Sequence, residues 1–569
     1  MSKKMIVERD VEARMRDGVI LRADVYRPDV PESIPVILQR TPYGKGFSQL
    51  AFALLAAERG YAVIIQDTRG RWASDGDGYP FLHEMEDGYD TVEWTGSQHW
   101  SNGKVGMFGG SYVGYTQFAA AAMQPAALKT ITPTITFCDP GDIFYRGGAI
   151  TLGSVVSWGL MAQAMMAIMR HPGDQMEKAL LTGQLIEAVD GMALGKTFSH
   201  LPLVDLPLIG RAGITPYLAD ALSHPPEDPF WKQALCSHHN IKVPALHIGG
   251  WYDLFTNHTL NDFNGIRLQG NPSQKVLIGP WIHGAFDGIN GEVDFGLQAS
   301  ALLLVPDEFL LRWFDYWLKG IDNGIMQEPP VQIFVMGDNQ WRLENEWPLA
   351  RTQYIPYYLH SNGAANTLNG NGTLSPEKPT SEAVDSYVYD PHNPVPTRGG
   401  ALCCWEAALP AGAYDQREIE ERTDVLVFTT PPLEKEVEVT GPIQVHLWAA
   451  TNAPDTDFTA KLVDVYPDGT ALHIADGQIR ARYREQHAKP ELLVPGKVYQ
   501  VRINLGSVSN LFVKGHRIRL DMSSSNFPKF EPNSNTGDPP GKWTRRVKAK
   551  NTIFVGGGRA SYLELSVRP

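Results

Sequence analysis

Cysteine is scarce in this sequence, and long apolar runs are absent. Four of its 569 residues are cysteine, and none are spaced as C-x-x-C, so neither a disulfide framework nor a zinc ribbon is indicated. We expect the four to be reduced thiols of a cytoplasmic protein (Cys138, Cys236, Cys403 and Cys404). The N-terminal residues include lysines but no apolar run after them, and no stretch of about 20 apolar residues occurs elsewhere. Neither a secretory signal nor a membrane partner is therefore expected.

Positive charge and metal-binding motifs are also sparse. The chain has 50 Lys and Arg against 63 Asp and Glu, a net charge of −13, which argues against nucleic acid as a main partner. No H-E-x-x-H or comparable cluster of ligands is present, and the adjacent His238 and His239 are expected at the surface. We therefore expect no metal site and no cofactor.

The sequence does contain a long alternation of apolar strands and helices. With 43% hydrophobic and 20% charged residues, the composition is that of a globular protein, and the length predicts two to four domains. Strands that are apolar on both sides indicate a mostly parallel sheet covered by helices on both faces. Such strands are predicted at 34–40, 61–66, 105–108, 128–135, 243–250 and 275–279.

Two regions depart from this alternation. Residues 140–239 are helical and unusually apolar, and the predicted helix at 151–169 carries Met161, Met165, Met166 and Met169. Methionines at helical spacing are more typical of a packed core than of a binding surface. From about residue 353 onward, short alternating strands replace the helices, which predicts an all-β sandwich of the jelly-roll type.

One strand-to-helix turn has the residues of a nucleophile. The apolar run 105–108 ends in Gly109-Gly110-Ser111, and an alanine-rich helix is predicted to follow. In a nucleophile elbow the serine sits at such a turn, between small residues that let the chain reverse. The second glycine here is Gly114, one position later than in G-x-S-x-G. The alternative is a glycine-rich turn with an incidental serine.

Two further residues complete the pattern that a nucleophilic serine needs. Asp253 follows the predicted strand 243–250, and His283 follows the predicted strand 275–279. Serine requires a histidine base, and the histidine requires a carboxylate on its other nitrogen. Asp253 could instead cap the next helix, and His283 is one of 16 histidines. The order Ser, Asp, His together with placement after strand ends favours a catalytic triad.

The motifs around these residues resemble those of the cocaine-esterase-like (CocE/NonD) hydrolases, which are related to X-Pro dipeptidyl peptidases and α-amino-acid ester hydrolases. The resemblance spans nearly the whole chain and rests on the segments 41–43, 67–70, 109–114, 250–253 and 279–283. It implies an α/β-hydrolase domain at 1–139 and 240–352, a helical cap at 140–239 and a jelly-roll domain at 353–569. It also implies an oxyanion hole formed by the Tyr43 phenol and the Tyr112 backbone N–H.

The residues after Asp253 bear on the substrate. Leu254 and Phe255 follow it, with no carboxylate nearby in the sequence, and Trp158 lies in the predicted cap. These side chains favour an uncharged or aromatic acyl group. We therefore expect a serine hydrolase that cleaves a small-molecule ester or amide through an acyl-enzyme. Since all three triad residues precede residue 290, the all-β region is expected to be structural.

Other functions remain open at this stage. An X-Pro dipeptidyl peptidase would need an acid to bind the substrate amine, and a glutaryl-type amide acylase would need an arginine to bind a carboxylate. A third alternative is a catalytically silent binding protein that uses its jelly roll to bind a carbohydrate or another partner. A homo-oligomer also stays open. The candidate acids for the amine are Asp139, Asp142 and Glu187, and the candidate arginines for the carboxylate are Arg146 and Arg170.

Overall fold

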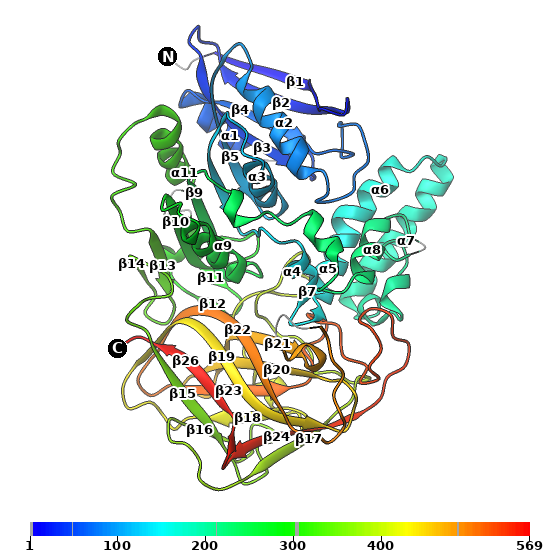
Figure 1. Ribbon diagram of the computed structural model, residues 1–569, viewed down its shortest axis with the longest axis vertical. Helices are drawn as coiled ribbons and strands as arrows, with labels where there is room; N and C mark the ends of the chain where they lie inside the picture. The colour runs from blue at the N-terminus through cyan, green and yellow to red at the C-terminus, as the bar shows by residue number, and fades with distance from the viewer. Residues whose placement is uncertain (1–3, 48, 212, 302–305, 486–488) are drawn as a thin grey trace.

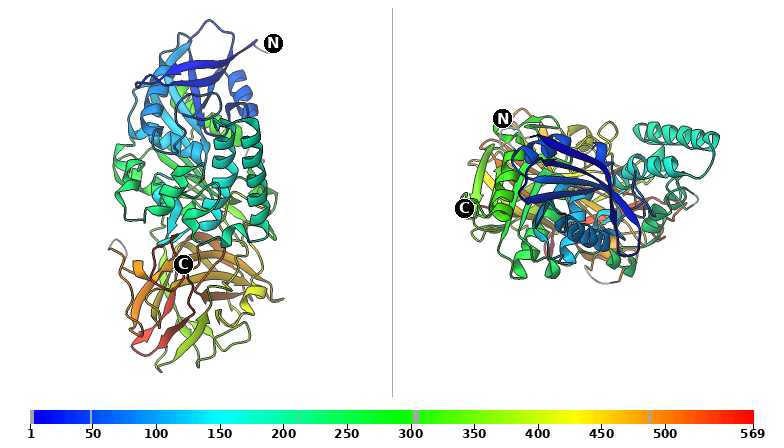
Figure 2. Two further views of the ribbon diagram at one scale, coloured as in Figure 1. Left: turned by 90° about the vertical axis from the view of Figure 1, so that its right-hand side faces the viewer. Right: turned by 90° about the horizontal axis from the view of Figure 1, so that it is seen from above.

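The computed structural model describes residues 4–47, 49–211, 213–301, 306–485 and 489–569. Figure 1 shows three parts: a sheet with its helices at the top, a group of helices at the right, and an all-β part at the bottom. In the right-hand view of Figure 2, helices of the second part stand away from the rest of the molecule.

The first part is built on one ten-stranded sheet with the order β1-β2-β4-β3-β5-β6-β9-β10-β13-β14. The strands from β4 to β13 in that order run parallel, while β1, β2 and β14 at the edges pair antiparallel. This confirms the predicted mostly parallel sheet. The strands are β1 (Met5–Arg14), β2 (Ile20–Pro28), β3 (Ile34–Thr41), β4 (Ala62–Asp67), β5 (Ser101–Gly110), β6 (Leu128–Thr134), β9 (Ala245–Tyr252), β10 (Gln274–Ile282), β13 (Val331–Val335) and β14 (Gln340–Glu344).

Helices cover both faces of this sheet because its central strands are apolar on both sides. On β3, Val36 and Leu38 belong to the core shared with Phe118, whereas Ile37 belongs to the core shared with Phe52. Successive residues of a strand point to opposite faces, so a continuous apolar run must be covered twice. One core holds α2 (Glu84–Gly96), α3 (Tyr112–Ala122) and α9 (Thr256–Leu268), and the other holds α1 (Leu50–Glu58) and α11 (Pro306–Phe314).

The second part lies between β6 and β9 in the chain and is mainly helical, as expected. Its long apolar helix runs from Leu152 to Arg170 with a π-helical segment at Gly159–Ala164. The helix is long and apolar enough to cross a membrane, but 61% of its apolar 18-residue stretch is buried inside the fold. Met166 is buried, whereas Met161, Met165 and Met169 are exposed, so the expectation that these methionines fill a core is wrong for three of them. The helices are α4 (Gly141–Phe144), α5 (Leu152–Trp158), α6 (Met165–Arg170), α7 (Gln175–Ala193) and α8 (Pro216–Ser223).

The third part is all-β, as predicted, and forms a twelve-stranded sheet whose pairings are antiparallel except for β16 with β18. Jelly-roll connectivity stays a prediction. Its apolar core is continuous with one core of the first part, and the Tyr252 hydroxyl donates to the His473 carbonyl at 3.1 Å across the boundary. The strands are β15 (Gln353–His360), β16 (Thr373–Ser375), β17 (Val384–Tyr389), β18 (Leu426–Thr429), β19 (Val437–Thr451), β20 (Asp457–Val465), β21 (Ala471–Arg480), β22 (Tyr499–Phe512), β23 (Arg517–Ser523), β24 (Ala549–Gly556), β25 (Arg559–Ala560) and β26 (Tyr562–Val567).

The turn between β5 and α3 places Ser111 in a conformation that side chains rarely adopt. Its φ is +58°, in the range that usually requires glycine. The residues on either side of Ser111 pack tightly and support this conformation. A Cβ on Gly109 would lie 2.3 Å from Val113 Cγ1, and one on Gly114 would lie 2.5 Å from Thr136 Cβ. The shifted second glycine is therefore explained: position 114 is where α3 presses against the segment after β6.

We predict that Gly114→Ala will destabilise the chain, because the added methyl group overlaps Thr136. Overpacking of this kind costs about 1–3 kcal/mol, so the unfolding midpoint should fall. Gly183→Ala is a matched control: it lies in α7, where an added Cβ meets nothing within 4 Å. That change should be neutral or stabilising by up to about 1 kcal/mol. Equal midpoints for the two variants would contradict the packing argument.

Candidate active site

Ser111, His283 and Asp253 meet at the carboxyl edge of the sheet. His283 Nε2 lies 3.1 Å from Ser111 Oγ, and His283 Nδ1 lies 2.7 Å from Asp253 Oδ1. The pairing of β9 with β10 explains this, since Tyr252 is the register partner of Ile282 and the next residues emerge side by side. The structure thus brings together the three residues predicted to form a triad.

The surroundings of His283 give its two nitrogens different roles. Asp253 is 1% exposed, and because a carboxylate accepts hydrogen bonds, the proton belongs on Nδ1. Nε2 is then free to accept the Ser111 hydroxyl proton. Asp253 does not cap α9, whose first turn follows Phe255 and has no side-chain cap. The Phe255 ring packs edge-on against His283, with 5.3 Å between ring centres.

Tyr43 lies in the loop after β3, next to Ser111. Its hydroxyl interacts with the Ser111 side chain and accepts a hydrogen bond from Trp158 Nε1 at 3.3 Å. Removal of the Tyr43 hydroxyl from water raises the pKa of the phenol, although its side-chain hydrogen bonds with Trp158 and Ser111 oppose that rise. The phenol therefore keeps its proton near neutral pH and can donate a hydrogen bond to an oxyanion. The contact between Trp158 and Tyr43 was not predicted, because the sequence suggested only a wall position for Trp158.

Tyr112 is the first residue of α3, so its backbone N–H has no acceptor within the helix. Its phenol points the other way, donating to Glu84 at 2.8 Å and accepting from the Phe81 N–H at 3.0 Å. Glu84 in turn pairs with the buried Arg40 at 2.7 Å. α2 begins at Glu84 and so supplies the acid that holds Tyr112 in place.

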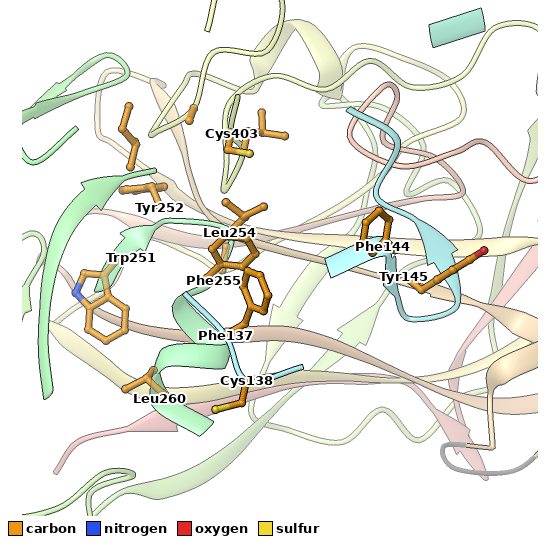
Figure 3. Close-up of a cluster of buried hydrophobic side chains, with 14 of the residues drawn as sticks. Phe137, Cys138, Phe144, Tyr145, Trp251, Tyr252, Leu254, Phe255, Leu260 and Cys403 are labelled. Carbon is orange, nitrogen blue, oxygen red and sulfur yellow. The ribbon is translucent and has the colours of Figure 1, made fainter. Parts of the chain in front are cut away.

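An aromatic cavity of about 60 Å³ adjoins Ser111, Tyr43 and Tyr112. The three predicted pocket residues Trp158, Leu254 and Phe255 line it, and Figure 3 shows Leu254 and Phe255 beside Phe137. Sequence reasoning missed the other aromatic residues of the wall because they lie on separate segments without a motif. They are Phe81, Phe137 and Phe144.

A larger cavity of about 790 Å³ lies on the other side of the serine. Ser111 and Tyr43 line both cavities. His283 lines the larger cavity and is not among the residues that line the aromatic one. Its wall is again largely apolar, with two acids, Asp287 and Asp307, among its lining residues. Ser111 therefore borders two distinct cavities.

The cysteines require a correction. Cys403 and Cys404 form a disulfide with their Cα atoms 3.7 Å apart, so the expectation of reduced thiols is wrong for this pair. Sequence reasoning considered spaced cysteines and missed that adjacent ones can bond when the backbone turns their side chains together. Cys138 and Cys236 are free and buried, as expected. The pair lines the aromatic cavity, and a cytoplasmic location stays a prediction.

None of the charged residues considered for substrate binding lines the aromatic cavity, whose wall contains no charged side chain in the described parts of the chain. Asp139 accepts from the Gly141 N–H, and burial raises the pKa of Asp142 to about 6. Glu187 is exposed on α7. Arg146 donates to the Leu254 carbonyl at 2.6 Å behind the wall, and Arg170 donates to the Ser74 carbonyl at 2.7 Å.

Comparisons with known proteins cover nearly the whole chain. The family model of the X-Pro dipeptidyl-peptidase (S15 family) matches residues 17–285, and that of the X-Pro dipeptidyl-peptidase C-terminal non-catalytic domain matches residues 323–564. The cocaine esterase of Rhodococcus sp. (strain MB1 Bresler) is 39% identical over 549 residues, covering 93% of each chain. An aminopeptidase from a marine sediment archaeon, Thaumarchaeota archaeon, has a TM-score of 0.80 and 25% identity, covering 100% of this chain and 97% of that one. A CocE/NonD family hydrolase from Staphylococcus aureus shares the fold, with a TM-score of 0.70 and 20% identity over 99% and 94% of the two chains.

Proposed function

The chain belongs to the X-Pro dipeptidyl-peptidase (S15) family of serine hydrolases, and we propose that it hydrolyses esters with an uncharged, apolar acyl group. One observation carries the substrate class: the cavity beside Ser111 is lined by aromatic and aliphatic side chains without a charge. Moving an apolar acyl group from water into this cavity is favourable, whereas an ionised group would lose its hydration there without gaining a partner of opposite charge.

Acylation begins with Ser111. His283 Nε2 removes the hydroxyl proton as Oγ attacks the carbonyl carbon, and Asp253 stabilises the imidazolium that forms. The distances of 3.1 Å and 2.7 Å support these roles. The negative charge on the carbonyl oxygen is stabilised by the Tyr112 N–H and the Tyr43 phenol. Both donors are held in place before the charge develops, which is the condition for effective stabilisation.

The two cavities then divide the substrate. His283 gives its proton to the leaving alcohol oxygen, so the alcohol occupies the larger cavity, which His283 lines. The acyl group stays on Ser111 in the aromatic cavity beside Tyr43 and Tyr112. A water molecule next enters from the side of His283, and His283 Nε2 removes a proton from it. Attack on the acyl carbon forms a second tetrahedral intermediate, whose collapse releases the acid and regenerates the Ser111 hydroxyl.

The peptidase alternative is less well supported by the site. A dipeptidyl peptidase must bind the ammonium of its substrate, and none of Asp139, Asp142 and Glu187 lines the aromatic cavity. The relative with 39% identity is named for an esterase activity, cocaine esterase, which favours an ester. The intact Ser111–His283 contact argues against a silent binding protein, since such a protein has no need of an aligned base.

Rates on a panel of substrates test the proposed class. Aryl and short aliphatic acyl esters should have kcat/KM values at least about 100-fold above those of α-amino acyl esters and X-Pro arylamides, because a buried, unpaired ammonium is costly. Each pair should share one alcohol or arylamine, so that only the acyl half changes. A preference for the amino acyl substrates would overturn the proposal and favour the peptidase alternative.

We predict that a fluorophosphonate probe labels Ser111 once per chain. Ser111→Ala should abolish labelling and hydrolysis, while Ser154→Ala should retain both; Ser154 lines the same cavity and serves as the matched control. Asp253→Asn should lower kcat by about 10⁴-fold, because the amide favours the wrong tautomer of His283. Labelled Ser111→Ala protein, detected by mass spectrometry, would refute the assignment.

The role of Tyr43 has its own prediction. Tyr43→Phe should lower kcat by about 10²–10³-fold with little change in KM, because the lost hydrogen bond forms mainly in the transition state. Tyr115→Phe is the control, since its hydroxyl donates to the Ala234 carbonyl at 2.7 Å, away from the serine. A loss confined to KM, or to the unfolding midpoint, would make Tyr43 a packing residue.

A further inference from the structure

Three potential metal ligands converge at the base of the helical part, outside the candidate active site. Cys138 follows β6, His238 starts the short turn His238–Asn240, and Asp262 lies on α9. One ligand atom from each lies within 4.8 Å of the other two. His238 Nε2 is 2.7 Å from Asp262 Oδ1, and the Cys138 N–H donates to Asp262 Oδ2 at 3.0 Å. His238, expected at the surface, is instead half-buried.

We propose that Cys138, His238 and Asp262 form a structural zinc site, contrary to the expectation of no metal. A thiolate, an imidazole and a carboxylate are each ligands that zinc takes in proteins. Charge also balances, since one thiolate and one carboxylate neutralise a divalent ion. That balance matters because the Cys138 and Asp262 residues are only 2% and 4% exposed, and an uncompensated charge there would be costly.

The geometry is close to what zinc needs. Zn–S and Zn–N bonds of about 2.3 and 2.0 Å at a tetrahedral angle place sulfur and nitrogen about 3.5 Å apart, and two bonds of about 2.0 Å place their ligand atoms about 3.3 Å apart. Here the three ligand atoms lie within 4.8 Å of one another, and His238 Nε2 and Asp262 Oδ1, at 2.7 Å, would move apart by about 0.6 Å to admit the ion. On binding, the Cys138 thiol releases its proton to solvent. The proton that His238 Nε2 donates to Asp262 moves to Nδ1, so that Nε2 can bind the ion. The His238 side chain is 31% exposed, so water can supply a fourth ligand.

Local packing already holds the histidine ring in position. An added Cβ on Gly265 would lie 2.1 Å from His238 Nδ1, so this glycine allows the ring to lie directly on α9, one turn after Asp262. The Cys236 N–H also donates to the Cys138 carbonyl at 2.9 Å. The ion would therefore join the beginning and the end of the helical part to α9.

The location links this site to the aromatic cavity without making it part of the chemistry. Phe137, which lines the cavity, directly precedes Cys138, and Figure 3 shows the two beside Leu260 of α9. Leu254 and Phe255, also in the cavity wall, lie just before α9. A zinc ion here would fix the two sides of that wall relative to each other.

Metal titration of the full chain tests the site. After removal of metals by a chelator, Co²⁺ should bind once per chain and produce a thiolate-to-cobalt charge-transfer band, and Zn²⁺ should displace it. Zn²⁺ should also raise the unfolding midpoint by at least about 2 °C. Cys138→Ser should remove the band and the shift, while Cys236→Ser, the neighbouring buried thiol, should keep both.

Circular dichroism establishes that each variant is folded. If Cys138→Ser fails to fold, Asp262→Asn replaces it and should weaken Zn²⁺ binding by at least about tenfold. A folded wild-type chain that binds neither ion at micromolar concentration would overturn the proposal, leaving only a hydrogen-bonded network. A band that survives in Cys138→Ser but is lost in Cys236→Ser would show that Cys236 binds the ion, and the proposed site would be wrong.

Discussion

The candidate site depends on one close contact, where α3 presses against the segment after β6 at Gly114 and Thr136. This contact holds Ser111 at a positive φ, and the Thr136 hydroxyl reinforces it by donating to the Ser111 carbonyl at 2.7 Å. Ser111 Oγ can then reach His283, while the first N–H of α3 stays available to a bound oxyanion. The backbone of one turn thus serves both the nucleophile and one donor to the proposed oxyanion.

The aromatic cavity is assembled from all three parts of the molecule. Ser111 comes from the sheet, Trp158 from the helical part and Cys403 from the all-β part. The third part is therefore more than a structural support, although it supplies none of the proposed triad. No charged side chain reaches the wall in the described parts of the chain, so under the proposed function the choice of acyl group would depend on its loss of water rather than on ion pairs.

The triad residues could be predicted because each follows an apolar strand, and strand order is visible in a periodic sequence. Trp158, Leu254 and Phe255 could be found for a similar reason, since they lie close to recognisable segments. Phe81 and Phe144 could not, because their positions depend on how the helical part folds over the sheet. The Cys403–Cys404 bond and the cluster around Asp262 were missed because contacts between distant segments, or between immediate neighbours, leave no periodic signal.

The two cavities on either side of Ser111 also have a kinetic consequence. Once the alcohol has left the larger cavity, the acyl group still fills the aromatic one, and the space beside His283 is open to any nucleophile that fits. With about 790 Å³, that space accommodates molecules much larger than water. An added alcohol would compete with water for the proposed acyl-enzyme, and the same architecture would then transfer the acyl group to a new ester.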